Sequence, residues 1–349
     1  MKKARTSELI LGRQYILLCM GLFSFILIAT VVSLGLGRFS KLSVLDIPKI
    51  LLHQIFPSIQ QTWTDTDESV LIYLRLPRIV AALIVGASLA ISGVSYQALF
   101  ANPVASSDTL GVTSSAAFGA ILGIFLNFST FGIKLISFSI GCIAVLLVFS
   151  VASRLSKGRN LTVYLILIGM VASSLFQALL SILKYVADPV DQLPKITYWL
   201  MGSFSNVKLH DLPFCVLFFI IGAVPLFFMR WRINLLSLSE CEAKSMGENI
   251  FLLRMVTVIC ATLLTSSAVA MTGGISWVGL VIPHITRFVV GSDSRRLLPA
   301  SALIGSLFLL VMDDIARSVS VYELPISVLT SLIGAPIFFI ILIKSRDQV

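Results

Sequence analysis

Two arginines three residues apart, Arg75 and Arg78, stand at the start of a long apolar segment. On a helix this spacing places both side chains on one face, and guanidinium groups bind carboxylates with good geometry. Arg317, near the end of a later apolar segment, offers a third guanidinium. These arginines either lie at the membrane interface and pair with carboxylates of this chain, or bind carboxylates of an external partner. Nearby acidic residues that could pair with the first two are Asp65, Asp67 and Glu68.

Arg317 also has acidic neighbours in its own segment. Asp313 and Asp314 precede it by four and three residues, which favours ion pairs on one helix face. A salt bridge within the chain is therefore the first expectation for Arg317, and docking of a partner is the second.

Residue types that carry catalysis or hold metals are scattered. The three histidines (His53, His210 and His284) fall in different segments, and the five cysteines form no CxxC pair. His284 follows a proline inside an apolar segment, where a hydrogen-bonded structural imidazole is expected. No G-x-x-x-x-G-K-[ST] motif occurs, so ATP binding through a P-loop is excluded. The sequence predicts no catalytic residue, no metal site and no cofactor in this chain.

The elements that carry these residues are apolar segments joined by short polar stretches. Hydrophobic residues make up 57% of the chain and charged residues 12%, with a mean hydropathy of +0.98. Membrane-spanning helices accommodate so much apolar surface because lipid solvates it. We predict an all-α polytopic membrane protein, one transmembrane domain over 1–349, with about ten spans: 15–36, 72–98, 112–127, 134–152, 162–183, 212–229, 252–271, 277–290, 297–316 and 325–343.

The placement of lysine and arginine predicts the orientation of the chain in the membrane. If both termini lie on the cytoplasmic side, the segments on that side carry 16 of the 26 basic residues, as the positive-inside rule requires. The cytoplasmic N-terminus is then 1–14, the long outer loop 37–70 and the longest inner loop 230–251. The net charge of +9 reflects this topology, and nucleic-acid binding is not expected because no basic folded domain is present.

Two further patterns concern helix packing. Small residues at Gly86, Ala90 and Gly93 predict close approach of another helix. The blocks 72–183 and 252–343 each hold four spans and run with opposite topology, which is compatible with an inverted repeat. No predicted span has an acidic or basic residue near its centre, which weighs against a proton- or sodium-coupled carrier.

Several motifs in order resemble the FecCD family, the permease subunits of binding-protein-dependent ABC importers for iron–siderophores, haem and cobalamin. The resemblance covers about 70–343. Its motifs are Arg-Leu-Pro-Arg at 75–78, Gly-Ala-x-Leu-Ala-x-Ser-Gly at 86–93, Gln97, Asn102-Pro103, Leu110-Gly111, Tyr-Trp-Leu-Met-Gly-Ser at 198–203, Glu242-Ala243 with Gly247, the run 273–287, Asp313 with Arg317, Glu323-Leu324-Pro325 and Gly334-Ala335-Pro336.

The chain also departs from this pattern. It has Asn-Pro-Val-Ala-Ser-Ser at 102–107 where the family usually has Asn-Pro-Leu-Ala-x-Pro. Ser115-Ala116 stands where a Gly-Ala pair is usual, and Gly274 replaces a frequent proline. These changes leave the class intact and leave the substrate open.

The resemblance implies the type II ABC importer permease fold and three groups of site residues. The inner segment 238–247, otherwise a solvated connector, would be a coupling helix seated in the ATPase subunit. Arg75, Arg78 and Arg317 would dock the binding protein, and Thr162 with Val163 would narrow the cytoplasmic exit. The coupling residues would be Glu240, Glu242, Ala243, Lys244, Ser245 and Gly247.

The sequence therefore predicts a permease subunit, not an enzyme, in the bacterial cytoplasmic (inner) membrane. Its expected partners are a second copy or a close paralogue, two ATPase subunits that bind ATP and Mg, and a periplasmic or lipid-anchored binding protein. A ferric siderophore is the first expected substrate, with haem, cobalamin and molybdate as alternatives. A stand-alone secondary carrier is the rival of another class.

Overall fold

A computed structural model of the chain describes residues 2–36, 46–54, 56, 58, 60–156, 160–238, 240–319 and 322–346. No strand occurs in these ranges, and the elements follow one another as α1 (Lys2–Gly35), α2 (Asp46–His53), α3 (Asp65–Ser69), the π-helical turn η1 (Val70–Arg75), α4 (Leu76–Leu99), η2 (Ser107–Leu110), α5 (Val112–Phe125), α6 (Thr130–Ser156), α7 (Leu161–Val186), α8 (Gln192–Leu200), η3 (Leu209–Asp211), α9 (Leu212–Phe228), α10 (Arg230–Ile233), η4 (Asn234–Ser237), α11 (Glu240–Ser245), α12 (Ile250–Thr272), α13 (Val278–Val290), α14 (Ser294–Val319) and α15 (Ile326–Arg346).

The predicted all-helical fold is confirmed, and each of the ten predicted spans coincides with a helix. Within the described ranges, seven helices are long and apolar enough to cross a membrane. Three shorter apolar helices cover 112–125, 278–290 and 326–341. The 277–290 segment is a separate helix, α13, with Pro283 inside it. The number of membrane crossings stays a prediction.

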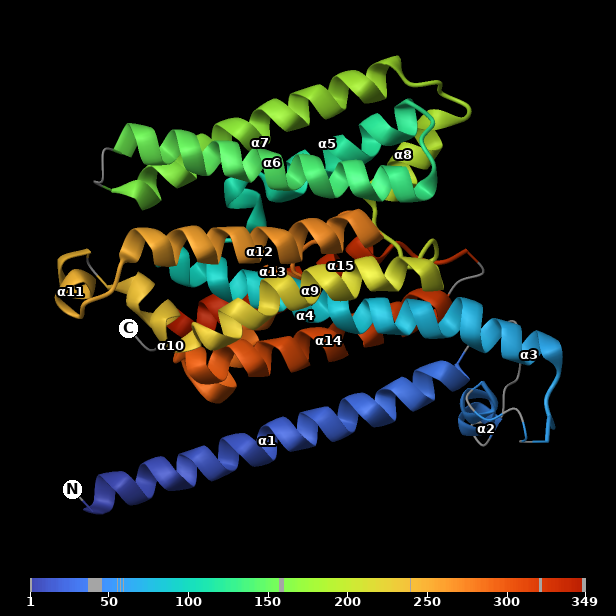
Figure 1. The fold of residues 1–349 in the computed structure, drawn as a ribbon, viewed down its shortest axis with the longest axis horizontal. Coiled ribbons are helices and arrows are strands. Elements are labelled where there is room, and N and C mark those ends of the chain that lie inside the picture. Colours follow the sequence, from blue (N-terminus) through green and yellow to red (C-terminus); the bar gives the residue numbers. More distant parts are fainter. Residues whose placement is uncertain are drawn as a thin grey trace.

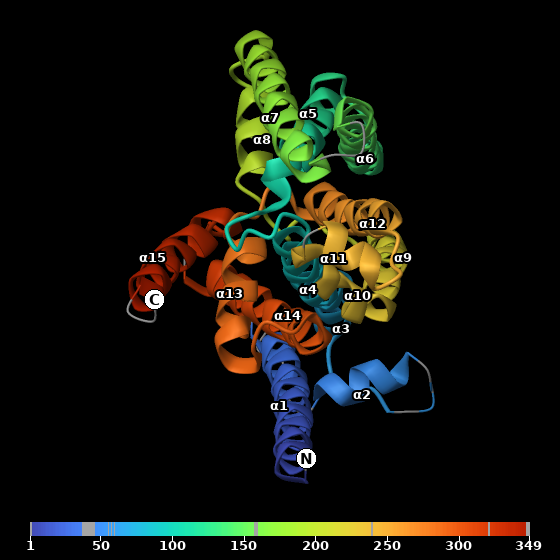
Figure 2. The same cartoon turned by 90° about the vertical axis from the view of Figure 1, so that its left-hand side faces the viewer.

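Helix α4 lies at the centre of the molecule. Figure 2 shows it surrounded by α9, α12, α13 and α14. Pro77 in its first turn suits a helix start, because the missing N–H is one that the helix would leave unbonded. Of an apolar 18-residue window in the span that contains α4, 83% is buried, against 11% of the corresponding window in α1. Helix α4 is therefore enclosed by other parts of the chain, whereas α1 leaves most of its apolar surface exposed.

Glycines explain how other helices reach α4. A Cβ on Gly86 would lie 2.2 Å from the Gly305 carbonyl oxygen of α14, and one on Gly93 would lie 1.9 Å from the Gly279 oxygen of α13. Neither distance leaves room for a side chain, so backbone meets backbone at both crossings. The predicted packing role of the small residues in 86–93 is confirmed.

Helices α5 to α8 form a group on one side of this centre, and α1 lies on the opposite side (Figure 1). Near the start of its apolar span, Gly12–Gly35, α1 is joined to α14 by the Tyr15 hydroxyl, which donates to the Arg296 carbonyl over 3.1 Å. Near its end, the Ser33 hydroxyl donates to Asp314 over 2.6 Å. Both contacts join residues 281 positions apart, so α1 and α14 run in the same direction and in a fixed register.

The start of α1, helix α11 and the end of α15 share one end of the molecule, while α2 and α3 lie at the other (Figure 1). This arrangement agrees with both termini and the 230–251 loop on one side, as predicted, although which side is cytoplasmic stays a prediction. The predicted outer loop 37–70 contains α2 and α3, and its part 37–45 lies outside the described residues.

The two blocks proposed as repeats have matching elements. Helices α4 to α7 have 24, 14, 27 and 26 residues, and α12 to α15 have 23, 13, 26 and 21. In each block the short second helix follows a segment outside the α-helices whose last residue has a positive φ: 75° at Gly111 and 72° at Trp277. This correspondence agrees with an inverted repeat, which stays a prediction.

Candidate functional site

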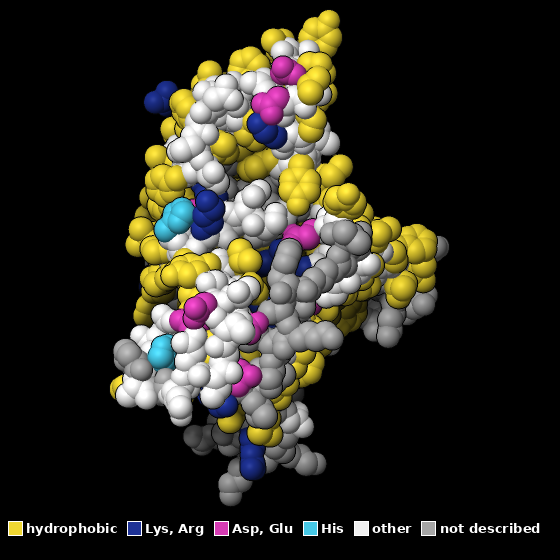
Figure 3. Space-filling model, turned by 90° about the vertical axis from the view of Figure 1, so that its right-hand side faces the viewer, with side chains coloured by type: hydrophobic (Ala, Val, Ile, Leu, Met, Phe, Trp, Pro, Cys, Tyr) yellow, Lys and Arg dark blue, Asp and Glu magenta, His cyan; other side chains and the backbone are white. Residues whose placement is uncertain are grey.

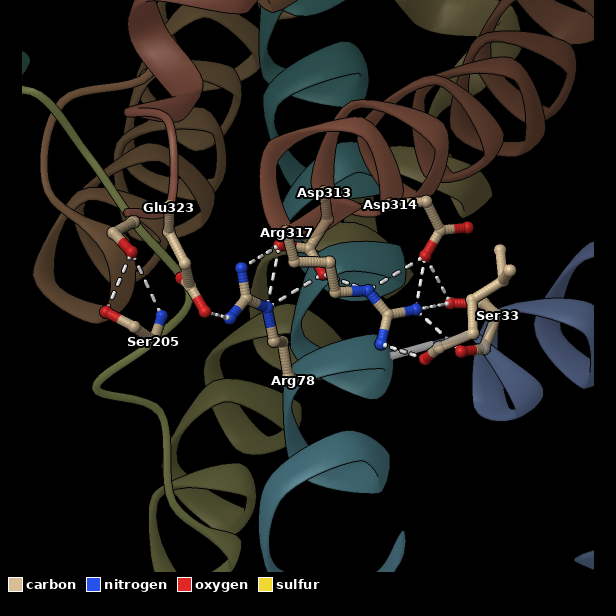
Figure 4. A network of polar contacts seen from close by, with 9 residues as sticks. Ser33, Arg78, Ser205, Asp313, Asp314, Arg317 and Glu323 are labelled. Atoms are coloured by element: carbon tan, nitrogen blue, oxygen red, sulfur yellow. Dashed lines mark hydrogen bonds and ion pairs between the residues drawn. The ribbon is translucent and has the colours of Figure 1, made fainter. Parts of the chain in front are cut away.

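Arg78 occupies the centre of a buried ion-pair cluster between α4 and α14 (Figure 4). Its Nε donates to both carboxylate oxygens of Asp313, over 2.8 and 2.9 Å, and its Nη1 contacts Glu323 Oε1 at 2.7 Å. Arg78 is 8% exposed and Asp313 is fully buried. Glu323 is the cluster's outward end, with a side chain 34% exposed. The cluster joins α4, α14 and the segment before α15.

Arg317 joins α14 to the end of α1 (Figure 4). Its guanidinium contacts the Asp314 carboxylate and donates to the Ser33 carbonyl over 2.6 Å and the Leu36 carbonyl over 3.0 Å. Its Nε lies 3.9 Å from Asp313. The predicted ion pairs between Arg317 and the two preceding aspartates are therefore confirmed.

The other arginine of the motif, Arg75, also turns inward. It is 4% exposed, and its Nη1 donates to the Leu34 carbonyl of α1 over 2.6 Å. Arg78 does not pair with the nearby acidic residues named above; its carboxylates come from Asp313 and Glu323, 235 and 245 residues later in the chain. A role of the three arginines in docking a partner stays a prediction. On the described part of the end that carries α2 and α3, acidic and basic side chains are interspersed (Figure 3).

The predicted polar helix of the inner loop is confirmed as α11, and a left-handed residue follows it. Gly247 has a φ of +80°, and a Cβ there would meet nothing within 4 Å. Ala243 is buried in the main apolar core, whereas Glu242 and Ser245 are exposed. The Ser245 hydroxyl donates to the Glu242 carbonyl over 2.6 Å. The backbones of Glu240 and Lys244 belong to α11, and their side chains lie outside the described part.

Polar contacts fix the ends of this inner loop. After Gly247, Glu248 pairs with Arg232 of α10 at 3.0 Å, and the Asn249 side chain accepts from the Leu252 N–H at the start of α12. Before α11, the Asn234 side chain donates to Asp293 over 2.8 Å. Helix α11 therefore projects from a loop held at both ends.

Asp293 connects the inner loop 230–251 with the segment 287–296, which contains the end of α13 and the start of α14. The sequence alone did not indicate this connection. Its partial burial alone would raise the carboxyl pKa, but hydrogen bonds from the Arg295 N–H and the Asn234 side chain outweigh this effect and hold the pKa below its ordinary value. The carboxylate therefore stays ionised at neutral pH and keeps its bonds to η4 and to the start of α14.

The predicted exit residues lie in the first turn of α7. Val163 is 52% exposed, and Thr162 is half-buried. Their role at a gate stays a prediction. His284 has the structural role expected for it, since its Nδ1 lies 3.0 Å from the Leu280 carbonyl and its ring packs edge-on against Phe338.

A second buried ion pair was not anticipated. Lys134 of α6 and Asp211 of η3 meet at 2.5 Å and are 5% and 2% exposed. The only sequence signal was a lysine at the first position of a predicted span. Within the described ranges, no group of three or more histidine, cysteine or acidic side chains is arranged to hold a metal ion.

Comparison with known proteins identifies the family. The FecCD transport family matches residues 25–344. The molybdate import system permease protein MolB of Haemophilus influenzae is 42% identical over 331 residues, which are 93% of this chain and 95% of that protein. A probable iron chelatin transport system permease protein of Helicobacter pylori is 38% identical over 280 residues, 79% of this chain and 83% of its own length.

A solved structure shows the same arrangement of helices. It is described as an inward-facing conformation of a metal-chelate type ABC transporter, and its TM-score is 0.82 with 40% sequence identity. The match covers 93% of this chain and 98% of the solved one. In sequence and in fold, this chain belongs to the FecCD transport family.

Proposed function

We propose that this chain is the membrane permease subunit of an ABC importer that carries a metal chelate across the bacterial cytoplasmic membrane. The observation that carries the proposal is the likeness, over 93% of the chain, to a metal-chelate type ABC transporter at a TM-score of 0.82. A ferric siderophore is the first substrate class we propose. Molybdate is the second candidate, because MolB is 42% identical. Haem and cobalamin remain alternatives with the same architecture.

The described geometry suits a subunit that receives work from outside. Helix α11 projects from a loop that is held by the Arg232–Glu248 ion pair and the Asn234–Asp293 hydrogen bond. A displacement of α11 is therefore passed through these contacts to α10, α12 and α14. In the proposal, two ATPase subunits bind ATP and Mg, contact α11 and switch the permease between outward- and inward-open states. A binding protein delivers substrate at the end that carries α2 and α3.

A second copy of the chain, or a close paralogue, completes the path in this proposal. The span of α7 is only 17% buried within one chain, and its exposed face is available to line a space shared with the second copy. A wide path of this kind suits a chelate better than a narrow ion filter does.

Transport should depend on the ATPase partner. Purified alone in liposomes, the chain should neither hydrolyse ATP nor accumulate substrate under a proton gradient, because its sequence has no P-loop. With the ATPase and binding protein added, uptake of ferric siderophore or of molybdate should appear only with ATP. Parallel assays with the two substrates identify the substrate class. Accumulation driven by a proton gradient in the chain alone would instead establish the rival secondary carrier.

Gly247→Val should weaken the stimulation of the ATPase subunits by substrate. Valine strongly disfavours a φ of +80°, so the turn after α11 must change although no neighbour clashes with the new side chain. The strain is about 1–3 kcal/mol and is local. We expect normal membrane insertion and at least about a tenfold loss of substrate-stimulated ATPase activity, a 1.4 kcal/mol effect on the coupled step.

Gly291 provides a matched control for this variant. It follows α13 with a φ of +84°, and a Cβ there would also meet nothing within 4 Å. Gly291→Val therefore imposes the same kind of strain at the same end of the molecule but away from α11. Equal ATPase stimulation in the Gly247→Val and Gly291→Val assemblies would mean that α11 is only a connector.

A further inference from the structure

The second half of the segment between α4 and α5, residues 105–111, packs against the middle of α7, whereas residues 101–104 are exposed. The Ser173 hydroxyl of α7 donates to the Asp108 carbonyl over 3.0 Å. A Cβ on Gly169 would lie 2.1 Å from the Thr109 carbonyl oxygen, so the two backbones touch. Ser173 stands at the middle of the 26-residue α7, one of the helices that are long and apolar enough to cross a membrane. Asp108 is therefore level with the middle of this predicted span.

The Asp108 side chain is exposed on the surface of the single chain, and it borders a cavity of about 290 Å³. Five residues with hydroxyl groups line this cavity: Ser92, Ser106, Ser107, Thr113 and Ser276. A carboxylate at mid-depth is costly in hydrocarbon, and non-helical backbone at that depth is tolerated where it is buried in protein or lines water. The exposure of Asp108 and the hydroxyl groups around it therefore point to an aqueous space.

Helix α7 shows where this space leads. Ser174, Gln177 and Ser181 are exposed at spacings of three and four residues, which places them on one face. They extend from the level of Asp108 toward the end of α7. On the same face in the other direction the exposed residues are apolar: Met170, Leu167 and Val163. The polar part of this face of α7 therefore ends level with Asp108.

We propose that Asp108 selects substrates by charge, as a carboxylate that lines the transport path at mid-depth. It favours neutral or cationic metal chelates and retards polyanions, among them the molybdate dianion. Two copies of the chain would place two such carboxylates in one path. The location of the path along α7 rests on the function proposed above, whereas the exposure of Asp108 and its position level with the middle of α7 do not.

The test uses thiol reactions in the full-length protein and requires no substrate, ATPase or binding protein. In a chain whose five native cysteines are replaced by alanine, Ser174→Cys reports the electrostatic potential near Asp108. The measured quantity is the ratio of the reaction rate with a cationic methanethiosulfonate reagent to that with an anionic one. We expect this ratio to be about tenfold higher at this cysteine than with a free thiol. Adding Asp108→Asn, which keeps the shape of the side chain, should reduce that ratio to the free-thiol value.

Ile143 is the control position. It is 55% exposed at the middle of α6, and the nearby Leu146 and Leu147 are 51% and 60% exposed, so Ile143→Cys should face lipid and react with neither charged reagent. A Ser174→Cys protein that is equally unreactive would overturn the aqueous path along α7. A charge preference unchanged by Asp108→Asn would overturn the role of Asp108. Neither result depends on whether the chain functions as an importer, which the uptake assay tests separately.

Discussion

An Arg78→Met variant is expected to lose about 3 kcal/mol of stability, because it leaves the buried Asp313 carboxylate with only its longer contact, 3.9 Å, to Arg317. Asp313 is fully buried and takes two hydrogen bonds from Arg78, so its carboxylate cannot be rehydrated without opening the contact between α4 and α14. Thermal unfolding of the purified protein in detergent measures the loss. An Arg295→Met variant is the matched control, since its partner Asp293 is partly exposed and the Arg295 side chain is 58% exposed.

A second substitution separates stability from docking. In Arg78→Met/Asp313→Leu, both members of the buried pair become apolar, and most of the lost stability should return. Glu323 is 34% exposed and can be hydrated. If Arg78 also contacts the binding protein, this double variant will be stable but will bind it less well, in a salt-dependent manner. A stable double variant with unchanged binding-protein affinity would restrict Arg78 to its structural role.

Gly93→Ala should be nearly as damaging, although it adds a single methyl group. The new Cβ would lie 1.9 Å from the Gly279 carbonyl oxygen, and a backbone oxygen cannot move aside as a flexible side chain can. Helices α4 and α13 must separate, at a cost of about 3 kcal/mol. The expected result is a low yield of folded protein and a lower unfolding temperature.

Gly21→Ala serves as the comparison. Gly21 lies in α1, where a Cβ meets nothing within 4 Å, and alanine is the better helix former by about 1 kcal/mol. This variant should be as stable as the parent chain or slightly more so. Equal unfolding temperatures for Gly93→Ala and Gly21→Ala would show that the crossing of α4 and α13 is looser than its backbone contact indicates.

The sequence was sufficient to predict the helices because hydropathy is a local property. Each predicted span matches a helix, and the small residues at 86–93 indicated the crossings of α4. Ion pairs within one helix could also be predicted, because Arg317 follows Asp313 and Asp314 at spacings of four and three residues. The ion pairs of Arg78 could not be predicted, because Asp313 and Glu323 lie 235 and 245 residues away and only the folded chain brings them together.

The segment 100–111 shows a second limit of prediction from the sequence. Hydropathy places it between two spans, and Asn102-Pro103 indicates an inner-face turn. Whether such a joint stays at the surface or returns into the bundle depends on tertiary contacts, here those of Thr109 and Asp108 with Gly169 and Ser173. The sequence argument that no span carries a central charge remains true of the spans. It does not extend to the joints, one of which places Asp108 level with the middle of α7.

The contacts between α1 and α14 have a consequence for how the protein responds to bilayer thickness. Tyr15 and Ser33 attach α1 near both ends of its apolar span, Gly12–Gly35, to Arg296 and Asp314, and the helical rise between the two attachments is about 27 Å, close to the thickness of the hydrocarbon layer. A helix attached at one end relieves hydrophobic mismatch by tilting alone. Because α1 is attached twice and in register, it cannot tilt without α14, so a thinner or thicker membrane acts directly on the helix that crosses α4 at Gly305.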